Sequence, residues 1–169
     1  MPFAFRPGAA RLWMDPFIYD TAAKSSSGAT ALSRLPSPQL MLKHGILNPA
    51  LASLLCRFRH TNWLVVADRG FPFWPQLETV DISLTDNIPT VRQVLAALRD
   101  NYIIGAALMA REVKGENDSK VLAEYQALLP GAKIQFLPHP DFKNRVPAAI
   151  GLIRTGDTTQ YGNILIQSA

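Results

Sequence analysis

Short apolar runs alternate with helical stripes of apolar residues over most of the chain after residue 48. The first stripe falls at the spacing of one helix face and consists of Leu51, Leu54, Leu55 and Phe58. Asn48 followed by Pro49 is a favourable helix start, because asparagine caps and proline fits the first turn. The run 63–67 is continuously apolar and bounded by polar residues, which is typical of a strand covered on both faces. The pattern therefore predicts a helix that leads into a buried strand.

The same alternation continues to the end of the sequence. Further strands are predicted at 80–84, 103–110, 134–137, 149–154 and 163–167. Helices are predicted after Pro89-Thr90, over 119–129 and over 141–146, with a polar loop at 114–118. Alternating strands and helices predict a three-layer α/β/α sandwich with a Rossmann-like, mostly parallel sheet of about six strands. The last two strands are joined by too few residues for a crossover helix, so we expect them to pair antiparallel.

Residues 1–40 differ from the rest of the chain. They contain five prolines and a serine-rich run, and they lack any periodic apolar pattern or long apolar stretch of a secretory signal. We predict an N-terminal extension over 1–40 that is flexible or reflects a start codon assigned too far upstream, and one domain over 41–169. An arm that docks through its apolar residues is the alternative.

The composition favours a globular protein and argues against membrane-spanning and nucleic-acid-binding classes. At 169 residues and 48% hydrophobic content, the chain is expected to fold as one globular domain with a sizeable core. No apolar run reaches the length of a membrane span. The single cysteine, Cys56, fits a reducing compartment and favours the cytoplasm. The net charge of +4 is scattered along the sequence, which argues against nucleic acid as a partner.

The sequence also lacks the motifs of cofactor-dependent chemistry. No glycine-rich phosphate-binding motif and no GxSxG nucleophile motif occurs. The three histidines are too far apart for a local set of metal ligands. We therefore predict neither a cofactor nor a metal.

Two ionisable residues flank the first predicted strand. His60 precedes the strand and titrates near neutrality, so it can exchange a proton, although it equally suits a helix end. Asp68 follows the strand, where α/β proteins bind their ligands, and could orient a histidine, hold a hydroxyl group or form a turn with Gly70. A meeting of His60 with Asp68 would require tertiary folding or a second subunit.

Other polar residues lie at the ends of later strands. His139 follows a predicted strand between two prolines, as a candidate site residue or as an exposed loop histidine. Tyr161 and Asn163 flank a glycine at the start of the last strand, where their phenol and carboxamide groups suit hydroxyl groups of a ligand or a turn. The aromatic residues of 71–75 could stack on a bound ligand or pack the loop. Glu112 and Lys114 are interpreted as structural or interface charges.

Several separated motifs resemble one family. They are His60-Thr61-Asn62, Val65-Val66-Ala67-Asp68, Gly70-Phe71-Pro72, Val80–Thr85, Ile88-Pro89-Thr90, Ile153–Asp157 and Tyr161–Leu165. Together they resemble the RbsD/FucU family of sugar mutarotases, which comprises D-ribose pyranase and fucose mutarotase. The likeness runs from Met41 nearly to the last residue.

The resemblance implies an isomerase that opens and closes the ring of ribose, fucose or a related sugar by acid–base catalysis. It implies His60 as the catalytic acid and Asp68, His139, Tyr161 and Asn163 as substrate-binding residues. It also implies a ring-like homodecamer with pockets at subunit contacts. Two alternatives remain: a non-catalytic sugar-binding accessory of a transport or catabolic system, and a structural oligomer with an inactive site. The second is favoured by Asn62, which stands where the family has an acidic residue.

Overall fold

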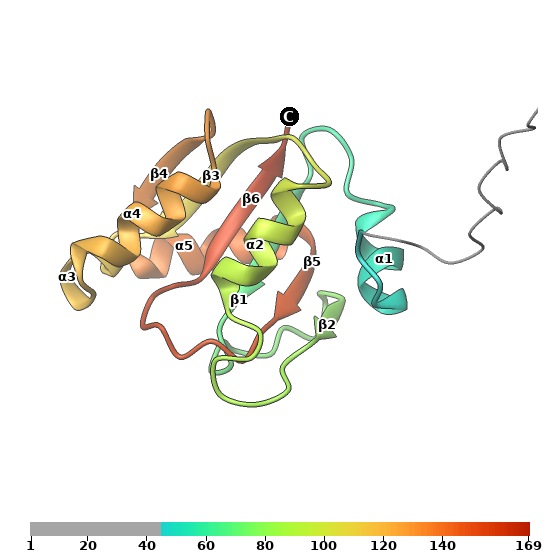
Figure 1. Ribbon diagram of the computed structural model, residues 1–169, viewed down its shortest axis with the longest axis horizontal. Helices are drawn as coiled ribbons and strands as arrows, with labels where there is room; N and C mark the ends of the chain where they lie inside the picture. The colour runs from blue at the N-terminus through green and yellow to red at the C-terminus, as the bar shows by residue number, and fades with distance from the viewer. Residues whose placement is uncertain (1–44) are drawn as a thin grey trace, which may run out of the picture. The chain divides into compact units, whose positions relative to one another are not determined.

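The computed structural model describes residues 45–169, so the predicted extension over 1–40 lies outside the described residues. Six strands form one sheet in the order β2-β5-β1-β6-β3-β4 (Figure 1). The strands are β1 (Trp63–Ala67), β2 (Thr79–Asp81), β3 (Ile104–Ala110), β4 (Lys133–Leu137), β5 (Ala149–Arg154) and β6 (Ile164–Ser168).

Helices cover both faces of this sheet. They are α1 (Pro49–Leu55), α2 (Val91–Arg99), α3 (Val113–Glu116), α4 (Ser119–Leu128) and α5 (His139–Arg145), followed by a 3-10 turn at Val146–Ala148. In Figure 1, α2 and α4 lie in front of the sheet and α5 lies behind it. The predicted three-layer α/β/α fold is confirmed, and three of the five strand pairs are parallel.

The alternation of side chains along β1 explains how the two faces are filled. Leu64 and Val66 pack into the core under α2, whereas Val65 and Ala67 pack into the core under α5. All four are fully buried, as expected of a central strand covered on both sides. Burial of such apolar side chains contributes about 1.5–3 kcal/mol each, so β1 is a rigid platform for the residues at its ends.

The last strand differs from the prediction in its neighbours. β6 runs antiparallel, as predicted, but it pairs with β1 and β3 and not with β5. β1 lies between β5 and β6, and the segment 155–163 passes over the end of β1 to connect them. Skipping one strand requires a span of roughly 10 Å, because neighbouring strands lie about 4.8 Å apart, and a short connection covers that distance. As a result, β6 begins at the edge where β1, β3 and β5 end.

Three predicted boundaries are also corrected. The strand predicted at 80–84 ends at Asp81, whose carboxylate accepts hydrogen bonds from the backbone and hydroxyl of Ser83 and turns the chain. The predicted loop at 114–118 contains the short helix α3. The helix predicted to begin at Asp141 begins at His139, because a proline is tolerated in the first helical turn. This last shift places His139 on a helix.

Candidate active site

A cavity of about 390 Å³ opens at the carboxyl end of β1. Its lining comes from three segments of the chain, and consists of Asp68, Gly70, Phe71, Pro72, His139, Lys143, Gln160, Tyr161 and Asn163. Four of the five predicted site residues are therefore brought together, and the fifth, His60, lies elsewhere. The reversed direction of β6 is the reason, because it brings the start of that strand beside the end of β1.

Asp68 and Asn163 form a reciprocal pair in this cavity. The backbone N–H of Asp68 donates to Asn163 Oδ1 at 2.7 Å, and Asn163 Nδ2 donates to Asp68 Oδ2 at 2.7 Å. The other carboxylate oxygen of Asp68 accepts the N–H of Gly70 at 2.8 Å, which is the turn considered from the sequence. Asn163 is only 4% exposed, so its contacts fix the carboxylate. Each carboxylate oxygen can accept a further hydrogen bond, which leaves Asp68 able to bind a hydroxyl group.

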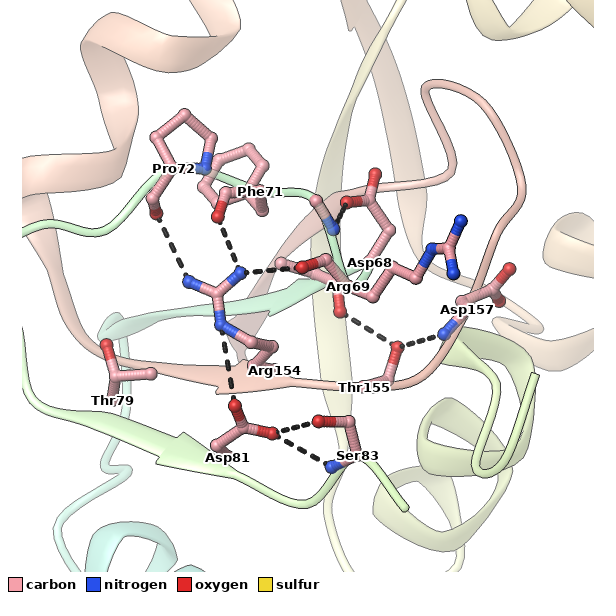
Figure 2. A network of polar contacts seen from close by, with 12 residues as sticks. Asp68, Arg69, Phe71, Pro72, Thr79, Asp81, Ser83, Arg154, Thr155 and Asp157 are labelled. Carbon is pink, nitrogen blue, oxygen red and sulfur yellow. Dashed lines mark hydrogen bonds and ion pairs between the residues drawn. The ribbon is translucent and has the colours of Figure 1, made fainter. Parts of the chain in front are cut away.

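The segment before β6 is anchored at both ends. The Thr155 hydroxyl donates to Ala67 O at 2.9 Å, and the buried Asp157 accepts the N–H of Val91 at 2.8 Å at the start of α2. Figure 2 shows Thr155 and Asp157 in this position. At the other end, the Tyr125 hydroxyl donates to Gly162 O at 2.7 Å. Burial raises the pKa of the Tyr125 phenol, which keeps this donor protonated.

These anchors hold Tyr161 in an uncommon conformation. Its φ of 54° lies in the left-handed region, where a non-glycine residue is strained. Its ring meets the imidazole of His139 edge-on, with 5.0 Å between the ring centroids. The conformation therefore directs the side chain to the cavity wall instead of leaving it in a simple turn.

His139 is the first residue of α5, and its backbone N–H donates to Glu112 Oε1 at 3.1 Å. Within the part of the chain that the structure describes, its buried Nδ1 has no hydrogen-bond partner. Burial lowers the pKa of the imidazole, and the cation of Lys143 lowers it further, against the opposing effect of Glu112 and Asp68. His139 is therefore neutral at physiological pH and can accept a proton or a hydrogen bond.

Two charged residues lie near His139, and only one of them was named from the sequence. Lys143 lines the cavity one helical turn after His139, and the predicted helix start at Asp141 concealed that spacing. Glu112 holds the first turn of α5, and the backbone hydrogen bond from His139 lowers the pKa of its carboxyl group. It is a structural charge, as interpreted, but one that contacts a site residue.

The aromatic residues of the 71–75 loop have different environments. Phe71 is buried and meets Phe142 of α5 edge-on, with 6.4 Å between the ring centroids. Trp74 packs against the same apolar cluster, whereas Phe73 is 71% exposed. The structure thus supports packing for Phe71 and Trp74, while Phe71 also lines the cavity.

His60 lies at the other end of β1, in an exposed turn. The neighbouring Asn62 accepts the backbone N–H of Arg59 at 2.9 Å, and the Thr61 N–H donates to Ser168 O at 3.1 Å. The full length of β1, roughly 16 Å at about 3.3 Å per residue, separates His60 from Asp68. Folding of one copy therefore does not bring His60 to the cavity.

Comparison with known proteins places this arrangement in a family. Residues 41–169 match the model of the RbsD / FucU transport protein family. The chain belongs to the RbsD/FucU family. The resemblance inferred from the separated motifs is thereby confirmed.

Named relatives of this RbsD/FucU member are similar over most of their length. D-ribose pyranase of Geobacillus kaustophilus is 38% identical over 128 residues, which cover 76% of this chain and 93% of that protein. D-ribose pyranase of Halalkalibacterium halodurans is 35% identical, with 76% and 97% covered. The structure of Bacillus subtilis RbsD complexed with D-ribose has a TM-score of 0.72 and 32% identity, with 76% and 98% covered.

A second solved structure shares the fold at lower identity. Fucose mutarotase of Streptococcus pneumoniae, complexed with L-fucose, has a TM-score of 0.65 and 20% identity, with 76% of this chain and 98% of that chain covered. In residues 45–169, no helix has the length and apolar character of a membrane span. Over the same residues, no group of three or more His, Cys, Asp or Glu side chains is placed to hold a metal ion.

Proposed function

We propose that this protein is a monosaccharide mutarotase, which interconverts the ring forms of ribose or a related sugar by acid–base catalysis without a cofactor. The observation that carries this proposal is the cavity itself, where a carboxylate, a neutral imidazole, a phenol and a carboxamide converge. Its residues are Asp68, His139, Tyr161 and Asn163, and relatives at 38% and 35% identity are D-ribose pyranases.

The reaction needs only proton transfers. A base takes the proton of the anomeric hydroxyl, the bond from the anomeric carbon to the ring oxygen breaks, and an acid protonates that ring oxygen. The open-chain aldehyde then closes on either face or through another hydroxyl group. Positioned acid–base catalysis contributes roughly 10²–10⁴-fold, or about 3–5 kcal/mol, which is sufficient for a reaction that already proceeds in water.

Within this proposal the cavity residues bind and orient the sugar. Asp68 accepts a sugar hydroxyl, Asn163 and Tyr161 hydrogen-bond neighbouring hydroxyl groups, and neutral His139 polarises or deprotonates one of them. The position of Asp68 supports this role, because Asn163 and Gly70 already orient its carboxylate. The catalytic acid is His60.

His60 would reach the cavity from a second copy of the chain. This proposal is supported by the exposure of His60 at the opposite end of β1 and by the resemblance, which implies a homodecamer with pockets at subunit contacts. Each contact of this kind would unite His60 of one copy with Asp68 and His139 of the other. A monomer at micromolar concentration in light scattering would contradict the shared site.

Ribose is the favoured sugar. The relatives at 38% and 35% identity are D-ribose pyranases, and the solved relative at 32% identity is a complex with D-ribose. We further propose that the domain spans 41–169 and acts in the cytoplasm, since the free thiol of Cys56 is exposed and suits a reducing compartment.

The test is saturation-transfer NMR on D-ribose and L-fucose, with the uncatalysed exchange subtracted. Enhanced exchange between ring forms supports the mutarotase. Binding without enhanced exchange would indicate a sugar-binding accessory protein, and the absence of both would indicate an inactive structural oligomer.

A further inference from the structure

One wall of the cavity is an irregular loop whose backbone carbonyl groups converge on a single side chain. Arg154 Nη1 donates to Phe71 O at 2.5 Å and to Arg69 O at 3.2 Å, and Nη2 donates to Pro72 O at 3.4 Å. Figure 2 shows the guanidinium group directed at these carbonyl oxygens. Phe71 and Pro72 line the cavity, whereas Arg154 does not.

The position of Arg154 at the end of a central strand holds its side chain in place. Arg154 is the last residue of β5, in register with Ala67 of β1 and Asp81 of β2. Its side chain is only 14% exposed, and its Nε lies 3.8 Å from Asp81 Oδ2. Asp81 is itself oriented by the backbone N–H of Ser83 at 2.9 Å. The guanidinium group is therefore held on one side by the sheet and on the other by the loop.

The geometry of the group matters as much as its charge. A guanidinium presents several N–H donors in a fixed plane, and here that plane serves three carbonyl groups at once. A lysine ammonium at the same position would keep the charge but would be a compact point charge without the planar fork. No other side chain that the structure describes donates to these three carbonyl oxygens.

The loop in turn contacts the helix that carries two cavity residues. The Phe71 ring packs against Phe142 of α5, and Phe142 lies between His139 and Lys143 on that helix. The ring of Phe142 also lies 6.4 Å from that of His139, measured between centroids. A change in the Phe71 backbone would therefore reach both the wall and the helix opposite it.

We propose that Arg154 is a positioning residue, which sets the sugar affinity of the cavity by holding the wall formed by Phe71 and Pro72. This inference rests on the proposed mutarotase function. Arg154 does not touch the sugar or the transferred proton. A preformed wall contributes to binding because less conformational freedom is lost when the sugar enters.

The expected signature is a change in KM with little change in kcat. The wall contacts the sugar equally in the ground state and the transition state, so its loss removes uniform binding. In Arg154→Ala we expect KM for D-ribose to rise roughly tenfold and kcat to stay within about threefold. Arg154→Lys should lie between wild type and Arg154→Ala, because it keeps the charge without the fork.

The experiment compares these variants in the full-length chain by NMR exchange kinetics, with and without millimolar guanidinium chloride. Added guanidinium ion should restore much of the KM of Arg154→Ala, because it can occupy the vacated site. Arg57→Ala is the matched control. Arg57 forms an exposed ion pair with Glu78, which lies at the other end of the loop that connects β1 to β2. Hydrogen exchange of the 69–73 backbone should rise in Arg154→Ala and not in Arg57→Ala.

The outcomes separate the two proposals. Wild-type KM and unaltered loop exchange in Arg154→Ala would overturn the positioning role while leaving the mutarotase intact. If Arg154→Ala loses both stability and kcat, and guanidinium restores neither, the effect is purely structural and the positioning role is also overturned. If the wild type binds sugar without catalysing exchange, the mutarotase proposal fails. The sugar dissociation constants of wild type, Arg154→Ala and Arg57→Ala then replace KM and still decide the role of Arg154. If the wild type binds no sugar, both proposals fail.

Discussion

The two ends of β1 present different kinds of site. At the carboxyl end, the side chain of Asp68 is fixed by Asn163 and Gly70 inside a cavity. At the amino end, His60 lies in an exposed turn, where its neighbours Thr61 and Asn62 form hydrogen bonds. One end is organised for binding before any ligand arrives, and the other keeps an ionisable side chain accessible.

Under the proposed roles of Asp68 and His60, this difference means that sugar binding and ring-oxygen protonation can be separated experimentally. The carboxyl-end residues belong to one copy and form a connected network. His60 has to be supplied to such a network from another copy, under the proposal above. The first predictions below each change one end of β1 and measure the effect on binding and on exchange.

The largest effect is expected for His60→Ala. Loss of a general acid acts on the transition state, so catalysed ring exchange should fall by roughly 10²-fold or more while sugar binding persists. His139→Ala should have a smaller effect on exchange and a larger effect on binding. Exchange NMR with a parallel binding titration measures both, and near wild-type exchange in His60→Ala would show that His60 is not the acid.

Mixing variants tests whether the two ends meet between copies. Co-expressed His60→Ala and Asp68→Asn chains can form contacts in which one copy keeps Asp68 and the other keeps His60. Such contacts should regain exchange that neither variant shows alone. Mixed oligomers that remain inactive would contradict a site shared between copies.

A smaller effect is expected for Asn163→Ala. The substitution leaves the Asp68 N–H and one carboxylate oxygen without their partner, so KM for D-ribose should rise about tenfold, or ~1.4 kcal/mol, before kcat changes. Asn101→Ala is the control, because its exposed amide bonds only the end of α2. A fall in kcat at unchanged KM would contradict a binding role for Asn163.

The pH dependence of exchange should report the state of His139. Its pKa lies below the ordinary value of 6.5, so the ring stays neutral as the pH falls to 6.5 and becomes charged below it. Catalysed exchange should therefore decline on the acid side, below pH 6.5. Lys143→Met should move this decline to higher pH, because the nearby cation lowers the His139 pKa, whereas exposed Lys120→Met should not. If the decline stays at the same pH in Lys143→Met, the titration of His139 is not its cause.

The smallest effect is expected from removing the residues before Met41. They lack periodic apolar faces and are rich in proline and serine, and the family match begins at residue 41. A chain that starts at Met41 should keep the melting temperature and exchange rate of the full chain. Aggregation or a lower, less cooperative melting transition would show that the domain needs these residues.

The sequence predicted the sheet well where strands are mostly apolar, as at 63–67 and 149–154, because burial on both faces leaves a clear pattern. It did not predict the neighbours of β6, since strand order depends on the path of the connection and not on local propensity. It placed Asp68 and His139 correctly at strand ends. It missed Lys143 because the start of α5 was placed two residues late, past the proline at 140.

The role of Arg154 was even less evident from the sequence. It was noted only within a family-like motif, and its partners are backbone carbonyl groups of an irregular loop. Every residue type supplies a backbone carbonyl group, so no side-chain pattern in 69–72 predicts the contact with Arg154. Such contacts become visible only when the tertiary path of the loop is known.

The central place of β6 constrains the order in which the protein can be assembled during synthesis. β6 follows all other described strands in the chain, yet it alone joins β1 to β3 in the sheet. Until it emerges, the β2-β5-β1 and β3-β4 parts each have an unpaired edge that other nascent chains could join. The cavity also lacks Asn163 until then. A growing chain therefore completes its cavity and pairs the inner edges of β1 and β3 in the same step.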